Sequence, residues 1–124
     1  MNALDSARTA YTNVTSAAKT PRSVEYEAFV RVTRRLQNAL RDDATFPELA
    51  AALHENRRLW TFVAAAVADP ANELPADLRA RMLYLSEFTI HHSRKVLDRS
   101  DSAEPLIEVN TAIMRGLHPQ SQVT

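Results

Sequence analysis

The sequence predicts an all-α fold, a small bundle of four to five helices with short connections. Apolar residues recur at three- and four-residue spacing along most of the 124 residues, which is the period of amphipathic helices. Prolines and Asp/Asn pairs interrupt this pattern where helices are expected to begin and end. Gly116 is the only glycine, which argues against hairpins and phosphate loops that need positive φ. The length fits a single helical domain, residues 1–124.

The first two helical segments differ in how strongly their sequences favour packing. A narrow apolar seam runs along the first segment: Leu4, Ala7, Tyr11, Val14 and Ala18. The rest of that segment is largely Ser, Thr, Asn and Arg, so we expect residues 1–19 to form a loosely docked helix. Thr20 and Pro21 fit the N-cap and first position of a second helix, residues 21–41, which Asp42 and Asp43 end. Its inward stripe is Tyr26, Phe29, Thr33, Leu36 and Leu40.

A third helix is predicted over residues 47–68. Thr45 and Glu48 have the spacing of a capping box, and Asp69-Pro70 ends the helix. One side of this helix carries Leu49, Leu53, Trp60, Val63 and Val67. Residues 59–67 are apolar almost all round the helix, which is typical of a helix in the middle of a bundle or one that offers a side to a partner.

The fourth helix, residues 75–98, has two apolar lines. The first line is Leu78, Met82, Leu85, Thr89 and Val96, and the second is Leu83, Ile90 and Leu97. Such a helix contacts two neighbouring helices, or one neighbour and a partner, which includes a second copy of the chain. Glu104-Pro105 begins a fifth helix with Leu106, Val109, Ile113 and Leu117 inward. We expect Gly116 to be its C-cap and residues 118–124 to be a flexible tail.

The sequence contains no recognisable catalytic, cofactor or metal site, so we expect that the protein is not an enzyme. No two of its four histidines have the four-residue spacing of a helical metal site, and we expect all four at the surface or its boundary: His54, His91, His92 and His118. There is no Gly-x-Ser-x-Gly motif and no phosphate loop. The absence of cysteine excludes disulfides and thiolate ligands.

Charge and hydropathy predict a soluble cytoplasmic protein. The formal net charge is zero, whereas nucleic-acid-binding proteins usually have a basic excess, so direct nucleic-acid binding is not expected. The longest uncharged apolar run, residues 59–68, is about half the roughly 20 residues of a membrane span. The N-terminus has neither the basic nor the apolar region of a secretory signal.

Arginines and aromatic residues suggest a partner-binding surface. If the second and third helices lie side by side, five arginines form one patch: Arg31, Arg34, Arg35, Arg57 and Arg58. This patch is a solvated face balanced by nearby carboxylates, an RNA-binding face, or a clamp for acidic groups of a protein partner; a solvated face is favoured over RNA binding. Trp60 fits either a core position or a binding anchor. The candidate partner-binding residues are Tyr26, Phe29, Arg34, Asn56, Arg57, Arg58, Trp60, Leu83 and Ile90.

Several strings of residues resemble the FlaF family, flagellar biosynthesis regulators of alphaproteobacteria. They include Glu25-Tyr26-Glu27-Ala28-Phe29, Asn56-Arg57-Arg58-Leu59-Trp60-Thr61 and Asn110-Thr111-Ala112-Ile113-Met114-Arg115-Gly116-Leu117. The resemblance spans nearly the whole chain and carries no catalytic motif. It implies a small cytoplasmic protein that promotes flagellin production and export, with flagellin and FlbT, a regulator that restrains translation of flagellin mRNA, as partners.

Two hypotheses follow from this resemblance. In the first, the protein is an export chaperone that covers the amphipathic terminal helices of flagellin in a groove with apolar anchors and an arginine rim. In the second, it regulates flagellin translation through FlbT or flagellin mRNA without direct chaperone activity. Affinity for RNA should fall steeply with salt, whereas apolar binding should not.

Overall fold

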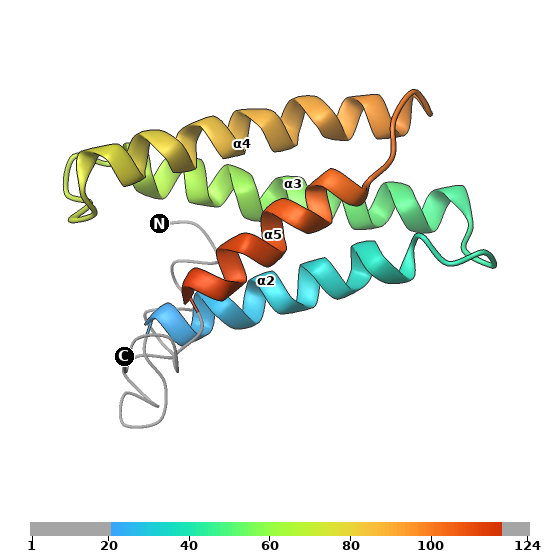
Figure 1. Cartoon of the computed structure of the whole chain (residues 1–124), viewed down its shortest axis with the longest axis horizontal. Coiled ribbons are helices and arrows are strands. Elements are labelled where there is room, and N and C mark those ends of the chain that lie inside the picture. The colour runs from blue at the N-terminus through green and yellow to red at the C-terminus, as the bar shows by residue number, and fades with distance from the viewer. Residues whose placement is uncertain (1–20, 118–124) are drawn as a thin grey trace.

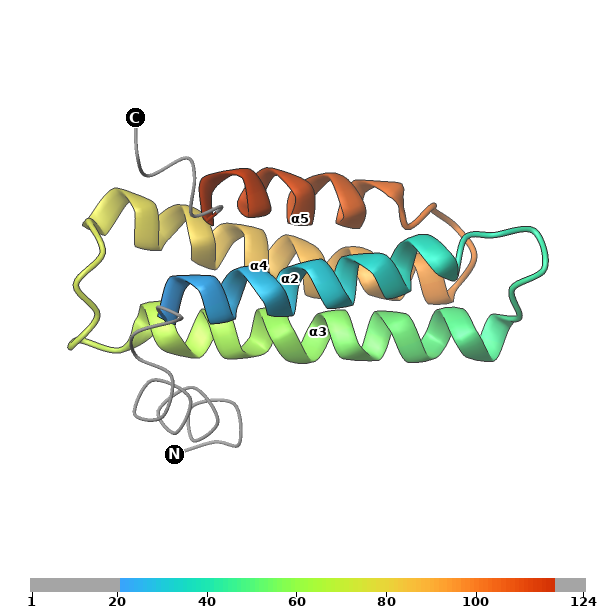
Figure 2. The same ribbon diagram turned by 90° about the horizontal axis from the view of Figure 1, so that it is seen from below.

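Four helices make up the part of the chain that the structure, a computed structural model, describes, residues 21–117 (Figure 1). They are α2 (Pro21–Asn38), α3 (Phe46–Ala68), α4 (Ala76–Leu97) and α5 (Glu104–Leu117). Figure 2 shows α3 and α5 on opposite sides of the bundle, with α2 and α4 between them. The predicted all-α bundle is confirmed. The helix predicted within residues 1–19 and the tail at 118–124 lie outside the described residues.

No helix in the described part is long and apolar enough to cross a membrane.

The end of α2 comes three residues earlier than predicted. The helix ends at Asn38, and the next amides bond to carbonyls only three residues back: Leu40 to Gln37 and Arg41 to Asn38, both over 3.2 Å. In this tighter turn the last carbonyls of the helix accept hydrogen bonds from Leu40 and Arg41 before the chain reverses toward α3. Leu40, predicted on the inward stripe, lies beyond the helix and is 40% exposed.

The start of α3 follows from its local sequence. Thr45 has an extended backbone, and its side-chain oxygen accepts a hydrogen bond from the Glu48 amide over 3.3 Å. The Glu48 carboxylate accepts in return from the Thr45 amide over 3.4 Å. The predicted capping box is therefore confirmed, and α3 begins at Phe46, one residue before the predicted start.

The end of α4 uses an arginine where glycine is usual. Pro75 and Asp98 are the caps of α4 and not part of it, so each end differs by one residue from the prediction. Arg99 follows with a φ of 61°. Its amide bonds to the Val96 carbonyl over 3.0 Å, and the Ser100 amide bonds to the Lys95 carbonyl over 2.9 Å. This pair of bonds is the Schellman motif, whose left-handed position favours glycine.

The prediction that Gly116 caps α5 is wrong. Gly116 lies within the helix, which runs to Leu117, and its φ is not positive. A Cβ atom built on Gly116 would meet nothing within 4 Å, so neither a left-handed turn nor a close approach requires glycine here.

The core consists of two apolar clusters, one toward each end of the bundle. Cluster 1 contains the buried residues Leu36, Ala52, Leu53, Val96, Ala103 and Leu106. Cluster 2 contains the buried residues Ala28, Phe29, Val32, Leu59 and Trp60. Each cluster draws side chains from several helices, so burial in the two clusters holds the helices together.

Candidate partner-binding surface

A hydrogen-bonded chain of three side chains joins α3 to α5 inside the bundle. The Trp60 indole Nε1 donates to Asn110 Oδ1 over 2.8 Å, and Asn110 Nδ2 donates to Asn56 Oδ1 over 2.8 Å. All three residues are 0% exposed. The indole has only a hydrogen to offer, which requires the Asn110 oxygen to face Trp60 and its amide nitrogen to face Asn56.

These asparagines belong to a polar layer between the two apolar clusters. Each of the four helices contributes a polar side chain that is at most 2% exposed, namely Thr33, Asn56, Thr89 and Asn110, and α4 also buries Ser86 and Ser93. Along α2, Thr33 lies between Phe29 of cluster 2 and Leu36 of cluster 1. Along α3, Asn56 lies between Leu53 of cluster 1 and Trp60 of cluster 2. The layer therefore crosses the bundle where the two clusters meet.

The polar layer is not fully hydrogen-bonded among the described residues. Thr33 Oγ1, Thr89 Oγ1 and Asn56 Nδ2 are buried and have no partner there. Each such atom costs on the order of 1–3 kcal/mol unless water reaches it. A fully apolar layer would avoid this cost, so the polar layer is suited to fixing one arrangement of the helices and less suited to maximising stability.

Three of the nine candidate binding residues lie inside the bundle. Phe29 is 2% exposed, and Asn56 and Trp60 are 0% exposed. The Phe29 and Trp60 rings meet edge to face, with centroids 5.5 Å apart and an angle of 81° between planes. The structure therefore places Trp60 in the core, the first of the two positions that its sequence allowed, and a partner does not reach these three side chains on the closed bundle.

The other six candidates are accessible to different degrees. Arg34 and Arg58 are exposed, whereas the others are half-buried: Tyr26, Arg57, Leu83 and Ile90. Arg58 forms an ion pair with Glu55 over 3.8 Å, one helical turn away on an exposed face. Such a surface pair contributes little to stability.

The helical period places Arg57 of α3 and Leu83 and Ile90 of α4 toward the outer seam between these two packed helices. On α4, His92 lies at the edge of the buried face nearest the α4–α5 connection, because its Nε2 bonds to the Ser102 carbonyl over 2.8 Å. The helical period places Leu83 and Ile90 on the opposite edge of the buried face, toward α3. Neither belongs to a core cluster. The same helical period places Arg57 on the α4 side of α3, and its Nε is buried without a partner in the described part.

The prediction that all four histidines lie at the surface or its boundary is wrong for His92. His92 is 5% exposed, and its ring stacks on Phe88 with centroids 5.3 Å apart. The Ser102 carbonyl is an acceptor only, so Nε2 of His92 carries the hydrogen. His92 thus ties α4 to the connection that leads into α5. Within residues 21–117, no group of three His, Cys, Asp or Glu side chains is placed to hold a metal ion.

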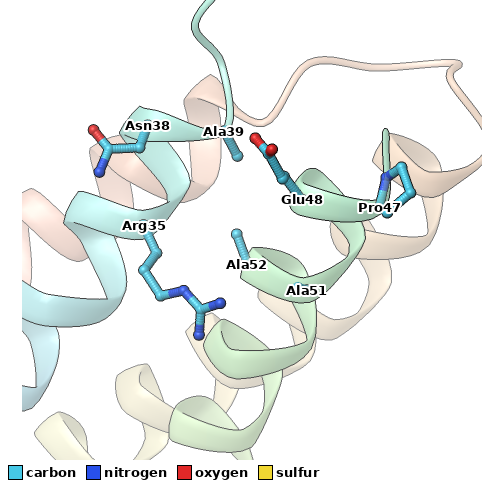
Figure 3. Close-up of a pocket in the computed structure, with 7 residues that line it drawn as sticks. All are labelled: Arg35, Asn38, Ala39, Pro47, Glu48, Ala51 and Ala52. Atoms are coloured by element: carbon cyan, nitrogen blue, oxygen red, sulfur yellow. The ribbon is translucent and has the colours of Figure 1, made fainter. Parts of the chain in front are cut away.

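An open groove lies between α2 and α3 at the end where these helices are connected (Figure 3). Its volume is about 380 Å³. The lining residues are Arg35, Asn38 and Ala39 from α2 with Pro47, Glu48, Ala51 and Ala52 from α3. α2 packs against α3, which was the condition for a patch of five arginines, but Arg57 lies toward α4 and does not join the arginines of α2. Arg35 lines this groove, and Arg31 and Arg34 are exposed on the preceding turn of α2.

Comparison with known proteins identifies the family. The family model described as "Flagellar protein FlaF" matches residues 7–117. The chain belongs to the FlaF family. No curated protein and no solved structure gives a significant match. The FlaF match contains all four described helices, the polar layer and the α2–α3 groove, so these features lie within the region that defines the family.

Sequence reasoning missed Asn110 and the groove. Asn110 opens one of the strings that resemble the FlaF family, but a polar residue on a helix gives no sign by itself that it is buried. The groove exists because Ala39, Ala51 and Ala52 meet across two helices, and a single-helix pattern does not show which small residues will face each other.

Proposed function

We propose that this FlaF-family chain binds flagellin as a cytoplasmic export chaperone and couples flagellin secretion to flagellin synthesis. The observation that carries the proposal is the match to the flagellar protein family over residues 7–117. The bundle supports it physically, since packed helices form grooves that accept amphipathic helices. Six candidate residues are accessible for contact with a partner: Tyr26, Arg34, Arg57, Arg58, Leu83 and Ile90.

The buried candidates have a supporting part in this proposal. Phe29, Asn56 and Trp60 hold α2, α3 and α5 in one arrangement and so position the exposed residues of the same helices. A chaperone that presents a fixed surface loses less conformational entropy on binding than one that must order itself first.

Calorimetric titration tests the proposal, with full-length flagellin and with flagellin that lacks its terminal helices as titrants. We expect binding to the full-length form with a negative heat-capacity change and weak dependence on salt, because apolar area is buried. Binding should be lost when the terminal helices are removed. Equal binding to both forms, or to neither, would contradict the chaperone proposal.

The exposed arginines of α2 favour a second candidate function, regulation of flagellin translation through FlbT or flagellin mRNA. Arg31, Arg34 and Arg35 share one side of α2, and the structure assigns none of them an ion pair within the described part. If they bind phosphates, affinity for flagellin mRNA should fall steeply as salt rises and should fall again in Arg34→Ala. An RNA affinity that neither salt nor this substitution changes would remove direct RNA binding and leave FlbT as the route.

A further inference from the structure

The α2–α3 groove combines an apolar floor with room for a partner's side chains. Alanines face it from both helices, and Ala52 in its floor is 1% exposed. A cavity of about 150 Å³ holds a benzene molecule. The groove volume of about 380 Å³ therefore has room for more than one large apolar side chain.

Charge on the groove is unequal between its two rims. Figure 3 shows Arg35 on the α2 side and Glu48 on the α3 side. The Glu48 carboxylate accepts the Thr45 amide in the capping box, whereas Arg35 forms no ion pair in the described part. Arg31 and Arg34 add two exposed guanidinium groups to the same helix. The α2 rim is therefore a cationic edge, and none of its three guanidinium groups forms an ion pair within residues 21–117.

Exposed apolar residues extend the surface at this end of the bundle. Leu40 and Phe46 are 40% and 39% exposed, and they neighbour the groove residues Ala39 and Pro47 in the chain. The Arg99 guanidinium lies 4.5 Å from the centre of the Phe46 ring, which links the α4–α5 connection to the start of α3. Large exposed apolar side chains beside a groove are typical of binding surfaces.

We propose that the α2–α3 groove receives the apolar face of an amphipathic helix whose apolar residues are flanked by carboxylates. One or two large apolar side chains of that helix enter the groove between Ala39 and Ala51, and a carboxylate pairs with Arg35. This inference rests on the proposed function, because it takes the terminal helices of flagellin as the source of the docking helix. It places the main contact on the α2–α3 groove and not on the α3–α4 seam that contains Leu83 and Ile90.

Two substitutions test the groove by different physical effects. Ala51→Trp fills the groove from an exposed position on α3, and Arg35→Glu reverses the charge of the α2 rim. The matched controls are Ala112→Trp on α5, on the opposite side of the bundle from α3, and Arg81→Glu on α4; both residues are exposed. Circular dichroism checks that each full-length variant is folded before calorimetric titration with flagellin.

We expect each groove variant to weaken flagellin binding at least about tenfold, which corresponds to about 1.4 kcal/mol, while each control stays close to the unsubstituted protein. The loss in Arg35→Glu should shrink as salt is added, and the loss in Ala51→Trp should not. If the unsubstituted protein binds flagellin and both groove variants bind equally well, the groove is not the site and the proposed function stands. If the unsubstituted protein does not bind flagellin, the proposed function and this inference both fail. A dimer in light scattering that Ala51→Trp converts to a monomer would identify a second copy as the occupant and overturn the proposal.

Discussion

Asn110 donates a hydrogen bond to Asn56 over 2.8 Å although the two residues are 54 positions apart in the chain. Asn110 also accepts the Trp60 indole hydrogen, so one amide of α5 satisfies two groups of α3. If α5 moved along the bundle by one turn, the indole and both amides would lose these partners inside a low-dielectric core. The pair therefore fixes which residues of α5 face α3, as a buried asparagine fixes register in coiled coils.

Asn110→Ala should destabilise the protein strongly. The substitution removes two buried hydrogen bonds, leaves the Trp60 Nε1–H without an acceptor and creates a small void. We expect a loss of about 3–5 kcal/mol in the free energy of unfolding, measured by urea denaturation. Asn38→Ala is the matched control, because Asn38 is exposed and should change stability by no more than about 0.5 kcal/mol. Equal effects of the two substitutions would mean that the buried chain does not hold α5.

Removing the unpaired hydroxyls of the polar layer should raise the free energy of unfolding, whereas Asn110→Ala should lower it. Thr33 and Thr89 are 2% and 0% exposed, and neither Oγ1 has a hydrogen-bond partner among the described residues. Valine has nearly the same shape without the hydroxyl, so Thr33→Val and Thr89→Val should each raise the free energy of unfolding by about 1 kcal/mol. Thr33→Ser, which keeps a hydroxyl and loses a methyl group, should lower it by about 1 kcal/mol. If the valine variants are less stable, an ordered water bonds to these hydroxyls in solution.

Local sequence determines the helices but not which polar residues they bury. The Thr45–Glu48 capping box needs only four residues, so the start of α3 was predictable to within one position. The burial of Asn110 depends on α5 packing onto the bundle so that its side chain meets Trp60 of α3, 50 positions away in the chain. The same reason explains His92, which reads as a surface residue on its own helix and becomes buried because the Ser102 carbonyl and Phe88 enclose it.

The sequence indicated that the arginines of the candidate surface would be exposed, but not whether the aromatic residues Phe29 and Trp60 would be buried. Arg34 and Arg58 are exposed as predicted, whereas Arg57 is half-buried with its Nε buried, because its position depends on how α3 packs. Aromatic residues serve equally well in a core or at an interface, so the sequence left Phe29 and Trp60 open between these positions. Only the packing of α2, α3 and α5 shows that both rings face inward.

Arg99 allows the cost of a left-handed residue to be measured. Its φ of 61° strains any side chain with a Cβ, whereas glycine adopts this conformation freely. Arg99→Ala and Arg99→Gly both remove the contact with the Phe46 ring, so the difference between them isolates the backbone term. We expect the glycine variant to be more stable than the alanine variant by about 1 kcal/mol in urea denaturation. Equal stability of the two variants would show that the turn after α4 relaxes away from this conformation in solution.

Trp60 distinguishes a core role from a binding role, because it is the only tryptophan and its emission reports its own environment. With the side chain 0% exposed, we expect Trp60→Ala to lower the free energy of unfolding by about 3–5 kcal/mol.

Trp60→Phe keeps an aromatic ring next to Phe29 but loses the bond to Asn110, so the loss in the free energy of unfolding should be smaller, about 1–3 kcal/mol. The folded Trp60→Phe variant should bind flagellin within about twofold of the unsubstituted protein, which is about 0.4 kcal/mol, because the buried side chain does not touch the partner. In the unsubstituted protein, the emission maximum should be blue-shifted and should stay unchanged when flagellin binds. A Trp60→Phe variant that is as stable as the unsubstituted protein but binds flagellin much more weakly would make Trp60 a partner anchor, and the bundle would then have to open at α5 for flagellin to reach it.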